Sequence, residues 1–281
     1  MAVPPGVGLG WRPEISGLFD ELPGLRFCEV IAESLSGRGP TPEPLADLVA
    51  RGVTVVPHGV RLSLGGAEPV DPGRVAFLAG CVEQVGAPLV SEHIAFVRAG
   101  GVDVGHLLPV PRTRETLDVL VRNVTAAQAA LPVPLALEPI AALFDWPDND
   151  IAEPDFLNRL LDRTGALLLL DVANVYANAR NRGQDPAALL QRLPLERIAY
   201  VHVAGGAEHD GLYHDTHTDP TPPEVLDLVR WLAEERGGTP FLLERDGDYP
   251  PKAQLYAELD AIADAAGQPR VTGQAAAAVD G

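Results

Sequence analysis

The chain has 281 residues, of which 46% are hydrophobic, and its net charge is −18. The hydrophobic content is enough for a buried core and excludes a disordered chain, while the acidic charge argues against nucleic acid or an anionic membrane as the main partner. No apolar run reaches the length of about 18 residues that a membrane span needs, and residues 1–14 lack a basic region followed by an apolar one. These features predict a cytoplasmic protein.

Short apolar runs alternate with amphipathic stretches along the whole chain. The runs that predict strands are 7–10, 26–33, 53–58, 88–93, 134–138, 166–171, 198–202 and 241–244. The stretches that predict helices are 42–52, 71–86, 112–131, 153–165, 185–193, 222–238 and 251–267. Several of these helical stretches begin with Pro and end at Gly, and continuous apolar runs are typical of parallel strands buried on both faces.

Eight strands that alternate with helices predict an α/β protein, a single TIM-type (β/α)8 barrel. A doubly wound open sheet is the alternative, but the glycines of GVGLGW (6–11) lack the spacing of a dinucleotide-binding turn. We expect the barrel domain to cover residues 1–268 and residues 269–281, which are small and weakly patterned, to form a disordered tail. Cys28 and Cys81 lie in apolar or helical segments without CxxC spacing, and we expect both thiols to be buried and reduced.

Seven of the eight predicted strands end in a side chain that can bind a metal or move a proton. In chain order these residues are Glu33, His58, His93, Glu138, Asp171, His202 and Glu244. Active sites of such barrels lie at the C-terminal ends of the strands, so these side chains should converge on one mouth. A single residue of this kind is more often a helix cap or a satisfied buried group, but seven in succession predict a metal or acid–base site.

The loop after the seventh predicted strand adds further polar side chains at the same mouth. Residues 202–219 contain His202, His209, Asp210, His214, Asp215, His217 and Asp219. A solvated polar loop is the simpler interpretation, but its position beside the strand ends favours a metal site. Imidazole and carboxylate donors without thiolate suit iron, manganese or zinc rather than a structural zinc or iron–sulfur centre. The donors are too many for one ion, which implies two or three.

Several segments resemble the DUF692 proteins, the multinuclear non-heme iron-dependent oxidative enzymes that modify ribosomally synthesised peptides. The segments are HGVRLSLGG (58–66), SEHIAF (91–96), HLLPVPRTRETLD (106–118), LLLDVANVYANARNRGQDP (168–186), VHVAGG (201–206), HDTHTDPTPPEVL (214–226) and LERDGDYPP (243–251). They occur in order, and the resemblance runs from about residue 6 to residue 262.

The resemblance implies a TIM-like barrel that holds two or three iron ions, mixed-valent Fe(II)/Fe(III), with O2 as co-substrate. By matching motif, the metal ligands would be His58, His93, Glu138, Asp171, Asn174, His202, Asp215, His217 and Glu244. His209 and His214 would lie outside the ligand set. Two departures from the family pattern, Arg61 in place of a frequent Gly and Pro139 in place of a frequent Asn, leave the ligands intact and bear on the choice of substrate.

The activity implied is oxidative modification of a side chain, often Cys, of a ribosomal precursor peptide in natural-product biosynthesis. The same resemblance implies a separate leader-recognition partner protein. An alternative is a dimetal (Zn/Mn) hydrolase or sugar isomerase of the xylose isomerase-like barrel type, which would use the same ligands without O2. A non-enzymatic barrel with a decayed site is a third hypothesis, but such a barrel would have lost ligands, and every matched position is occupied.

Overall fold

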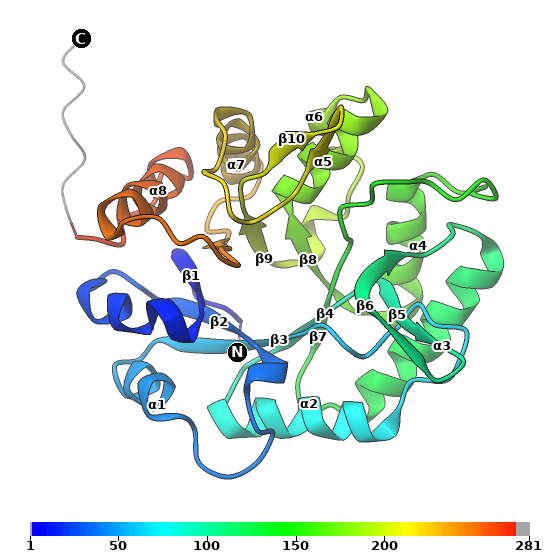
Figure 1. The fold of residues 1–281 in the computed structure, drawn as a ribbon, viewed down its shortest axis with the longest axis horizontal. Coiled ribbons are helices and arrows are strands. Elements are labelled where there is room, and N and C mark those ends of the chain that lie inside the picture. Colours follow the sequence, from blue (N-terminus) through cyan, green and yellow to red (C-terminus); the bar gives the residue numbers. More distant parts are fainter. Residues whose placement is uncertain (1, 274–281) are drawn as a thin grey trace.

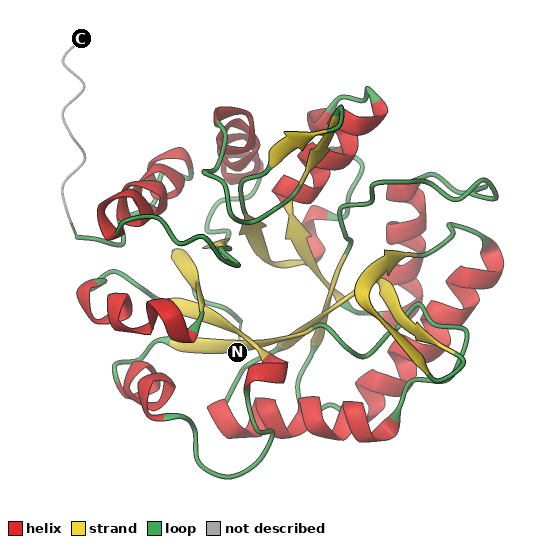
Figure 2. Cartoon of the chain, viewed as in Figure 1, coloured by secondary structure: helices red, strands yellow, loops and turns green. Residues whose placement is uncertain are grey.

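The computed structural model describes residues 2–273, and its centre is a closed barrel of eight parallel strands inside a ring of helices (Figures 1 and 2). The barrel strands are β1 (Val7–Trp11), β2 (Phe27–Ile31), β3 (Thr54–Gly59), β4 (Val90–His93), β7 (Leu135–Glu138), β8 (Leu167–Asp171), β9 (Ile198–Val203) and β12 (Phe241–Leu243). Strand β1 closes the barrel because it pairs in parallel with both β2 and β12. The predicted (β/α)8 barrel and its eight strands are therefore confirmed.

The helices pack around the outside of this barrel. They are α1 (Glu43–Ala50), α2 (Pro72–Val85), α3 (Arg114–Ala130), α4 (Glu153–Thr164), α5 (Val172–Arg182), α6 (Pro186–Leu190), α7 (Pro223–Glu235) and α8 (Lys252–Ala265), with 3-10 helices at Pro13–Glu21, Ala32–Ser34 and Leu195–Arg197. All of the predicted helical stretches are present. Helix α5 is an addition, and it begins directly where β8 ends because the side chain of Asp171 accepts hydrogen bonds from the backbone N–H groups of Ala173 and Asn174.

Two antiparallel hairpins lie outside the barrel sheet and were not expected from the sequence. Strands β5 (Ala95–Ala99) and β6 (Val102–Pro109) form the first, and β10 (Ala207–His209) and β11 (Leu212–His214) form the second. They follow the C-terminal ends of β4 and β9, so both belong to the loops on the face where active sites of such barrels lie.

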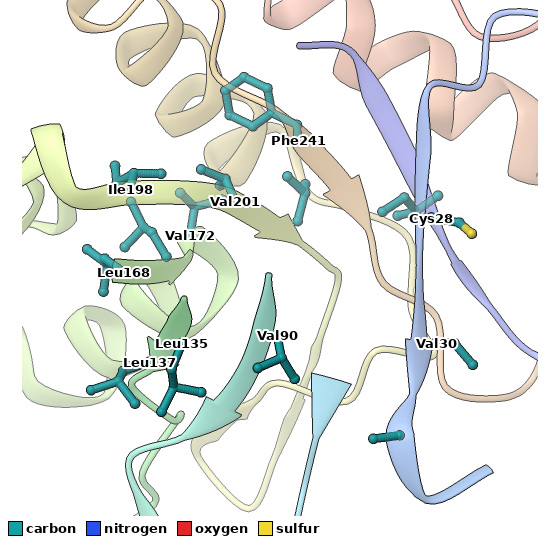
Figure 3. Packing of buried hydrophobic residues seen from close by; sticks show 14 of the residues in the cluster. Cys28, Val30, Val90, Leu135, Leu137, Leu168, Val172, Ile198, Val201 and Phe241 are labelled. Atoms are coloured by element: carbon teal, nitrogen blue, oxygen red, sulfur yellow. The ribbon is translucent and has the colours of Figure 1, made fainter. Parts of the chain in front are cut away.

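Side chains that point outward from the strands pack against the helices. Figure 3 shows this layer, in which Cys28 and Val30 of β2 and Leu135 and Leu137 of β7 lie at alternate positions along their strands. This alternation is the period of a strand, in which residues i and i+2 share a face. Cys28 and Cys81 are both free and buried, as expected.

A second apolar cluster fills the inside of the barrel. Its buried members are Val3, Phe27, Val56, Leu89, Ala136, Leu169, Tyr200 and Leu242. The rings of Phe27 and Tyr200 meet edge to face with centroids 6.1 Å apart, although β2 and β9 are not neighbours in the sheet. Gly8 of β1 leaves room for this packing, because a Cβ atom there would lie 2.8 Å from the Phe27 ring. The interior below the strand ends is therefore closed by packed side chains.

The chain after α8 is described as far as Gly273. Within this part Val271 is buried, and its carbonyl accepts a hydrogen bond of 2.9 Å from the backbone N–H of Gly24, so the packed chain continues past residue 268. The rest of the expected tail, 274–281, lies outside the described residues. Among residues 2–273 no helix has the length and apolar character that crossing a membrane requires.

Candidate metal centre

A layer of polar side chains lies directly above the apolar filling of the barrel. At each barrel strand except β1, an inner residue of the apolar cluster is followed two positions later by a polar residue. These pairs are Phe27 and Glu29, Val56 and His58, Leu89 and Ser91, Ala136 and Glu138, Leu169 and Asp171, Tyr200 and His202, and Leu242 and Glu244. Because residues i and i+2 of a strand share a face, every polar member points into the barrel on the C-terminal side of its apolar partner. His93 follows Ser91 by the same spacing and lies at the end of β4.

The ligand atoms of this layer fall into four groups in which all atoms lie within 4.8 Å of one another. The groups are His58, His93 and Glu138; Glu138, Asp171, His202 and Glu244; Asp171, Asp215 and His217; and His217, Glu244 and Asp246. All eight His, Asp and Glu residues expected as ligands are in these groups, and the groups overlap through shared residues. The structure thus brings these side chains together, while their role as metal ligands stays a prediction.

Glu138 occupies the middle of the arrangement. Its Oε2 lies 3.4 Å from Nε2 of His58 and 3.3 Å from Nε2 of His93, and its Oε1 lies 3.4 Å from Nδ1 of His202. Further out, Nε2 of His217 lies 2.6 Å from Oδ2 of Asp215. A carboxylate with imidazoles on both oxygens is suited to bridge two cations.

Each of the four histidines of the cluster has one ring nitrogen within hydrogen-bond distance of a group that is not among the expected ligands. The acceptors are the Ser91 hydroxyl for His58 Nδ1 (2.8 Å), the Gly59 carbonyl for His93 Nδ1 (3.2 Å), Glu29 Oε2 for His202 Nε2 (2.8 Å) and Asp246 Oδ2 for His217 Nδ1 (2.9 Å). The other ring nitrogen of each histidine faces the carboxylates of the four groups. This is the arrangement that metal-binding histidines have in proteins.

Several buried atoms of the cluster have no hydrogen-bond partner, which tests whether the residues fit a metal. They are Glu138 Oε2, Asp171 Oδ2, His202 Nδ1, Asp215 Oδ1 and Glu244 Oε2. His202 Nδ1 and Glu244 Oε2 lie 2.9 Å apart as an ion pair, without the geometry of a hydrogen bond. Buried polar atoms are nearly always partnered, so a concentration of unpartnered donor atoms in one cluster fits a place for cations. The donors are nitrogen and oxygen only, which suits iron, manganese or zinc.

The pKa values show how strongly the buried groups act on one another. Burial alone would lower the pKa of His93, but Glu138 and Glu92 outweigh it and raise the pKa to about 9. Burial alone would raise the pKa of Glu138, but His93 and His202 outweigh it and lower the pKa to about 2. Burial together with the neighbouring Asp215 and Glu138 raises the pKa of Asp171. Protons thus balance the charge of this cluster, and metal ions that bind there would displace them.

Two of the expected residues lie at the edge of the cluster. Asn174, on the first turn of α5, donates from Nδ2 to the carbonyl of Pro139 at 3.2 Å and lies 3.5 Å from Oε1 of Glu138. Its amide nitrogen, not its oxygen, is therefore turned toward the cluster, and its role as a ligand stays a prediction. Glu33 lies beyond the end of β2, where its carboxylate accepts from the backbone N–H of Val60, and it belongs to none of the four groups. The rings of His209 and His214 meet edge to face on the hairpin β10–β11, with centroids 5.5 Å apart.

Sequence reasoning missed Glu29, Asp246 and Arg12. Glu29 is the inward polar residue of β2, whereas the pattern of strand ends predicts Glu33 at the mouth. The feature that could have identified Glu29 is a charged residue in the middle of the apolar run RFCEVIAE. Asp246 follows Glu244 by two positions and holds His217. Arg12 follows β1 and forms ion pairs with Asp246 at 2.5 Å and Glu244 at 3.7 Å.

Known proteins resemble this chain over nearly its whole length. A family model described as "RiPP precursor modification enzyme MbnB/TglH/ChrH" matches residues 6–267. A UPF0276 protein of Streptomyces avermitilis is 55% identical over 264 residues, which is 92% of this chain, and the chain spans 54% of the length of that relative. A UPF0276 protein of Caulobacter vibrioides is 37% identical over 257 residues, 91% of this chain and 92% of that relative.

Solved structures show the same architecture at low sequence identity. A xylose isomerase domain protein from Planctomyces limnophilus has a TM-score of 0.58 and 16% sequence identity, and the match covers 94% of this chain and 98% of that chain. This likeness shows the fold, a xylose isomerase-like TIM barrel.

Proposed function

The chain belongs to the family of RiPP precursor modification enzymes that the MbnB/TglH/ChrH model describes, as its resemblance to DUF692 proteins predicted, and from this premise we propose that it is an iron-dependent oxidative enzyme. Its substrate would be a side chain, in our proposal a Cys, of a ribosomally synthesised precursor peptide. O2 would be the co-substrate. A separate protein would recognise the leader segment of that peptide.

The observation that supports this proposal best is the position of Glu138 between two groups of nitrogen and oxygen donors. His58, His93 and Glu138 would hold one ion, and Glu138, Asp171, His202 and Glu244 would hold a second. The group of Asp171, Asp215 and His217 offers a place for a third. Iron bound there would supply one-electron oxidation with O2, which protein side chains cannot provide.

The chain's own residues keep one side of this cluster closed and the other open. His58 and His202 have side chains that are 1% and 0% exposed, above the packed interior of the barrel. The side chain of His217 is 17% exposed and that of Asp246 is 43% exposed. A substrate side chain would therefore approach past His217, while water is excluded from the opposite side.

A pocket beside the mouth supports a substrate of peptide size. It has a volume of about 490 Å³, and Glu33, Arg61, Arg74, Phe77 and Glu92 are among the residues that line it. Arg61 is exposed and follows His58 by three positions, so the departure from the family pattern noted in the sequence lies in this pocket. In our proposal the pocket receives a residue that neighbours the reacting side chain.

The test is to express the protein in iron-supplemented medium, purify it without oxygen and determine metals per chain by elemental analysis. We expect two or three iron ions per chain. When a Cys-containing precursor peptide and its partner protein are added, we expect O2 consumption and a change in the mass of the peptide. Iron that binds without any change to such a peptide would reject the proposed substrate but keep the metal centre.

A dimetal hydrolase or sugar isomerase remains the second candidate, because histidine and carboxylate donors also suit zinc and manganese. The same purification separates the two. Zinc or manganese that stays bound, while iron fails to load under reducing conditions, would favour the second candidate. Turnover that does not depend on O2 would favour it as well.

A further inference from the structure

One buried chain of hydrogen bonds connects two histidines that belong to different metal-binding groups. Oε2 of Glu29 lies 2.8 Å from Nε2 of His202 and accepts a hydrogen bond of 2.5 Å from the hydroxyl of Tyr200. The hydroxyls of Tyr200 and Ser91 lie 2.7 Å apart, and Oγ of Ser91 lies 2.8 Å from Nδ1 of His58. All five residues are 0 or 1% exposed.

The direction of each bond in this chain follows from the number of hydrogens. Tyr200 has one hydroxyl hydrogen and donates it to Glu29, so its oxygen can only accept from the hydroxyl of Ser91. Ser91 then has no hydrogen left for His58, and its oxygen accepts from Nδ1–H of that histidine. At the other end His202 donates from Nε2 to the same carboxylate oxygen.

These directions fix the tautomers of two imidazoles at once. His58 carries its hydrogen on Nδ1, which leaves the lone pair of Nε2 facing Glu138 at 3.4 Å. His202 keeps a hydrogen on Nε2, so Nδ1 is the nitrogen that faces Glu138 at 3.4 Å and Glu244 at 2.9 Å, and an ion bound there would take the place of a proton on Nδ1. The two histidines would therefore present different ring nitrogens to the ions, because His202 donates to Glu29 directly and His58 donates to Ser91, whose chain of hydrogen bonds ends at Glu29.

We propose that Glu29 is a positioning residue that sets the coordinating nitrogen of both His58 and His202, directly for His202 and through Tyr200 and Ser91 for His58. This inference rests on the proposed metal centre. It assigns a role to three buried polar residues that are not in the ligand set, and it makes one carboxylate common to two groups that would hold different ions.

The variants separate the two arms of the chain. Glu29→Gln replaces the common acceptor by an amide that carries hydrogens of its own, and we expect it to weaken metal binding at both groups by about 10–100-fold, the usual effect of losing such a partner. Tyr200→Phe and Ser91→Ala interrupt only the arm to His58, so the group of His58 should be affected and that of His202 kept. Tyr256→Phe is the matched control, since Tyr256 lies on α8 and its hydroxyl donates to the carbonyl of Leu18, away from the cluster.

The measurement uses Zn²⁺ as a diamagnetic probe with histidine-labelled protein. Long-range ¹H–¹⁵N spectra of the Zn²⁺-loaded wild type should show His58 bound through Nε2 and His202 bound through Nδ1. In Tyr200→Phe the His58 signals should change and those of His202 persist, whereas Glu29→Gln should change both and Tyr256→Phe neither.

The outcomes distinguish this inference from the proposed centre. Zn²⁺ bound through the same nitrogens with unchanged affinity in Glu29→Gln would overturn the role of Glu29 and leave the centre intact. A wild type that binds neither Zn²⁺ nor iron would overturn both. Circular dichroism of each variant shows whether the fold is retained, and Ser91→Ala provides the test of the His58 arm if Glu29→Gln does not fold.

Discussion

Nη2 of Arg12 lies 2.5 Å from Oδ1 of Asp246, in an ion pair between residues 234 positions apart in the sequence. The pair joins the segments that follow β1 and β12, which are neighbours in the barrel. The other oxygen of Asp246 lies 2.9 Å from Nδ1 of His217. Arg12 therefore fixes the carboxylate that in turn fixes a histidine of the candidate centre.

Asp246→Asn should loosen His217 without removing a ligand. An amide can turn a donor instead of an acceptor toward Nδ1, so we expect ions held by His217 to bind about tenfold more weakly, while the group of His58 and His93 is unaffected. Metal titration followed by elemental analysis measures this. Asp227→Asn, which removes one partner of the exposed pair with Arg230, is the control. Loss of a whole ion in Asp246→Asn would show instead that Asp246 is itself a ligand.

Glu138→Gln and Asp215→Ala should differ in the number of metals lost. Glu138 belongs to two of the four groups, and Asp215 to one. If the groups hold separate ions, the first variant should lose two ions per chain and the second one ion, as counted after anaerobic purification. Equal losses in the two variants would mean that the ions bind only as a single cooperative unit.

The stability of the metal-free protein should depend on pH on both sides of a maximum. The pKa of His93 is raised from 6.5 to about 9, so its contribution is complete below pH 6.5 and is lost as the pH rises toward 9. The pKa of Glu138 is lowered from 4.5 to about 2, so its contribution is complete above pH 4.5 and is lost as the pH falls toward 2. Each group changes the free energy of unfolding by at most about 1.4 kcal/mol per pH unit.

Denaturant unfolding between pH 3 and pH 9 checks this, and we expect the maximum between pH 4.5 and pH 6.5. His93→Asn should reduce the fall on the alkaline side and leave the acidic side unchanged. A free energy of unfolding that increases between pH 6.5 and pH 9 in the wild type would contradict the interaction of His93 with Glu138.

Neither thiol should react while the protein is folded. Burial raises the pKa of Cys81 to about 11 and also raises that of Cys28, and both side chains are 0% exposed. Because the thiolate is the reactive form, iodoacetamide at pH 8 should leave both residues unmodified in the native protein and modify both after denaturation. Mass spectrometry reads the result directly, and rapid labelling of the native chain would show that the strand or helix carrying that thiol opens.

The repeated pattern of an apolar run that ends in a polar residue was enough to predict the barrel and most of its inward polar side chains. It succeeded for His58, Glu138 and His202 because these residues lie at or next to strand ends and share the inward face with the apolar residue two positions before.

The same pattern failed where the inward polar residue is not last in its run. In β2 the residue that faces the cluster is Glu29, and the run continues through Val30 and Ile31 before Glu33, which binds the backbone of Val60 instead. The face of a residue depends on the register between strands, which the sequence of one strand does not contain. The contact of Arg12 with Asp246 could not be predicted from the sequence either, because it exists only when β1 and β12 pair.

The ligands of the candidate centre come from several barrel strands, and this determines when metal can bind during folding. Glu244 follows β12 and shares a group with Glu138, Asp171 and His202, which lie at or next to the ends of β7, β8 and β9. A chain in which β12 has not yet paired lacks this group, so metal would load there only after β12 has joined the barrel. Since ions that bind only the native state also stabilise it, a loaded chain has by that fact completed its fold, and cells short of the metal would accumulate folded but less durable protein.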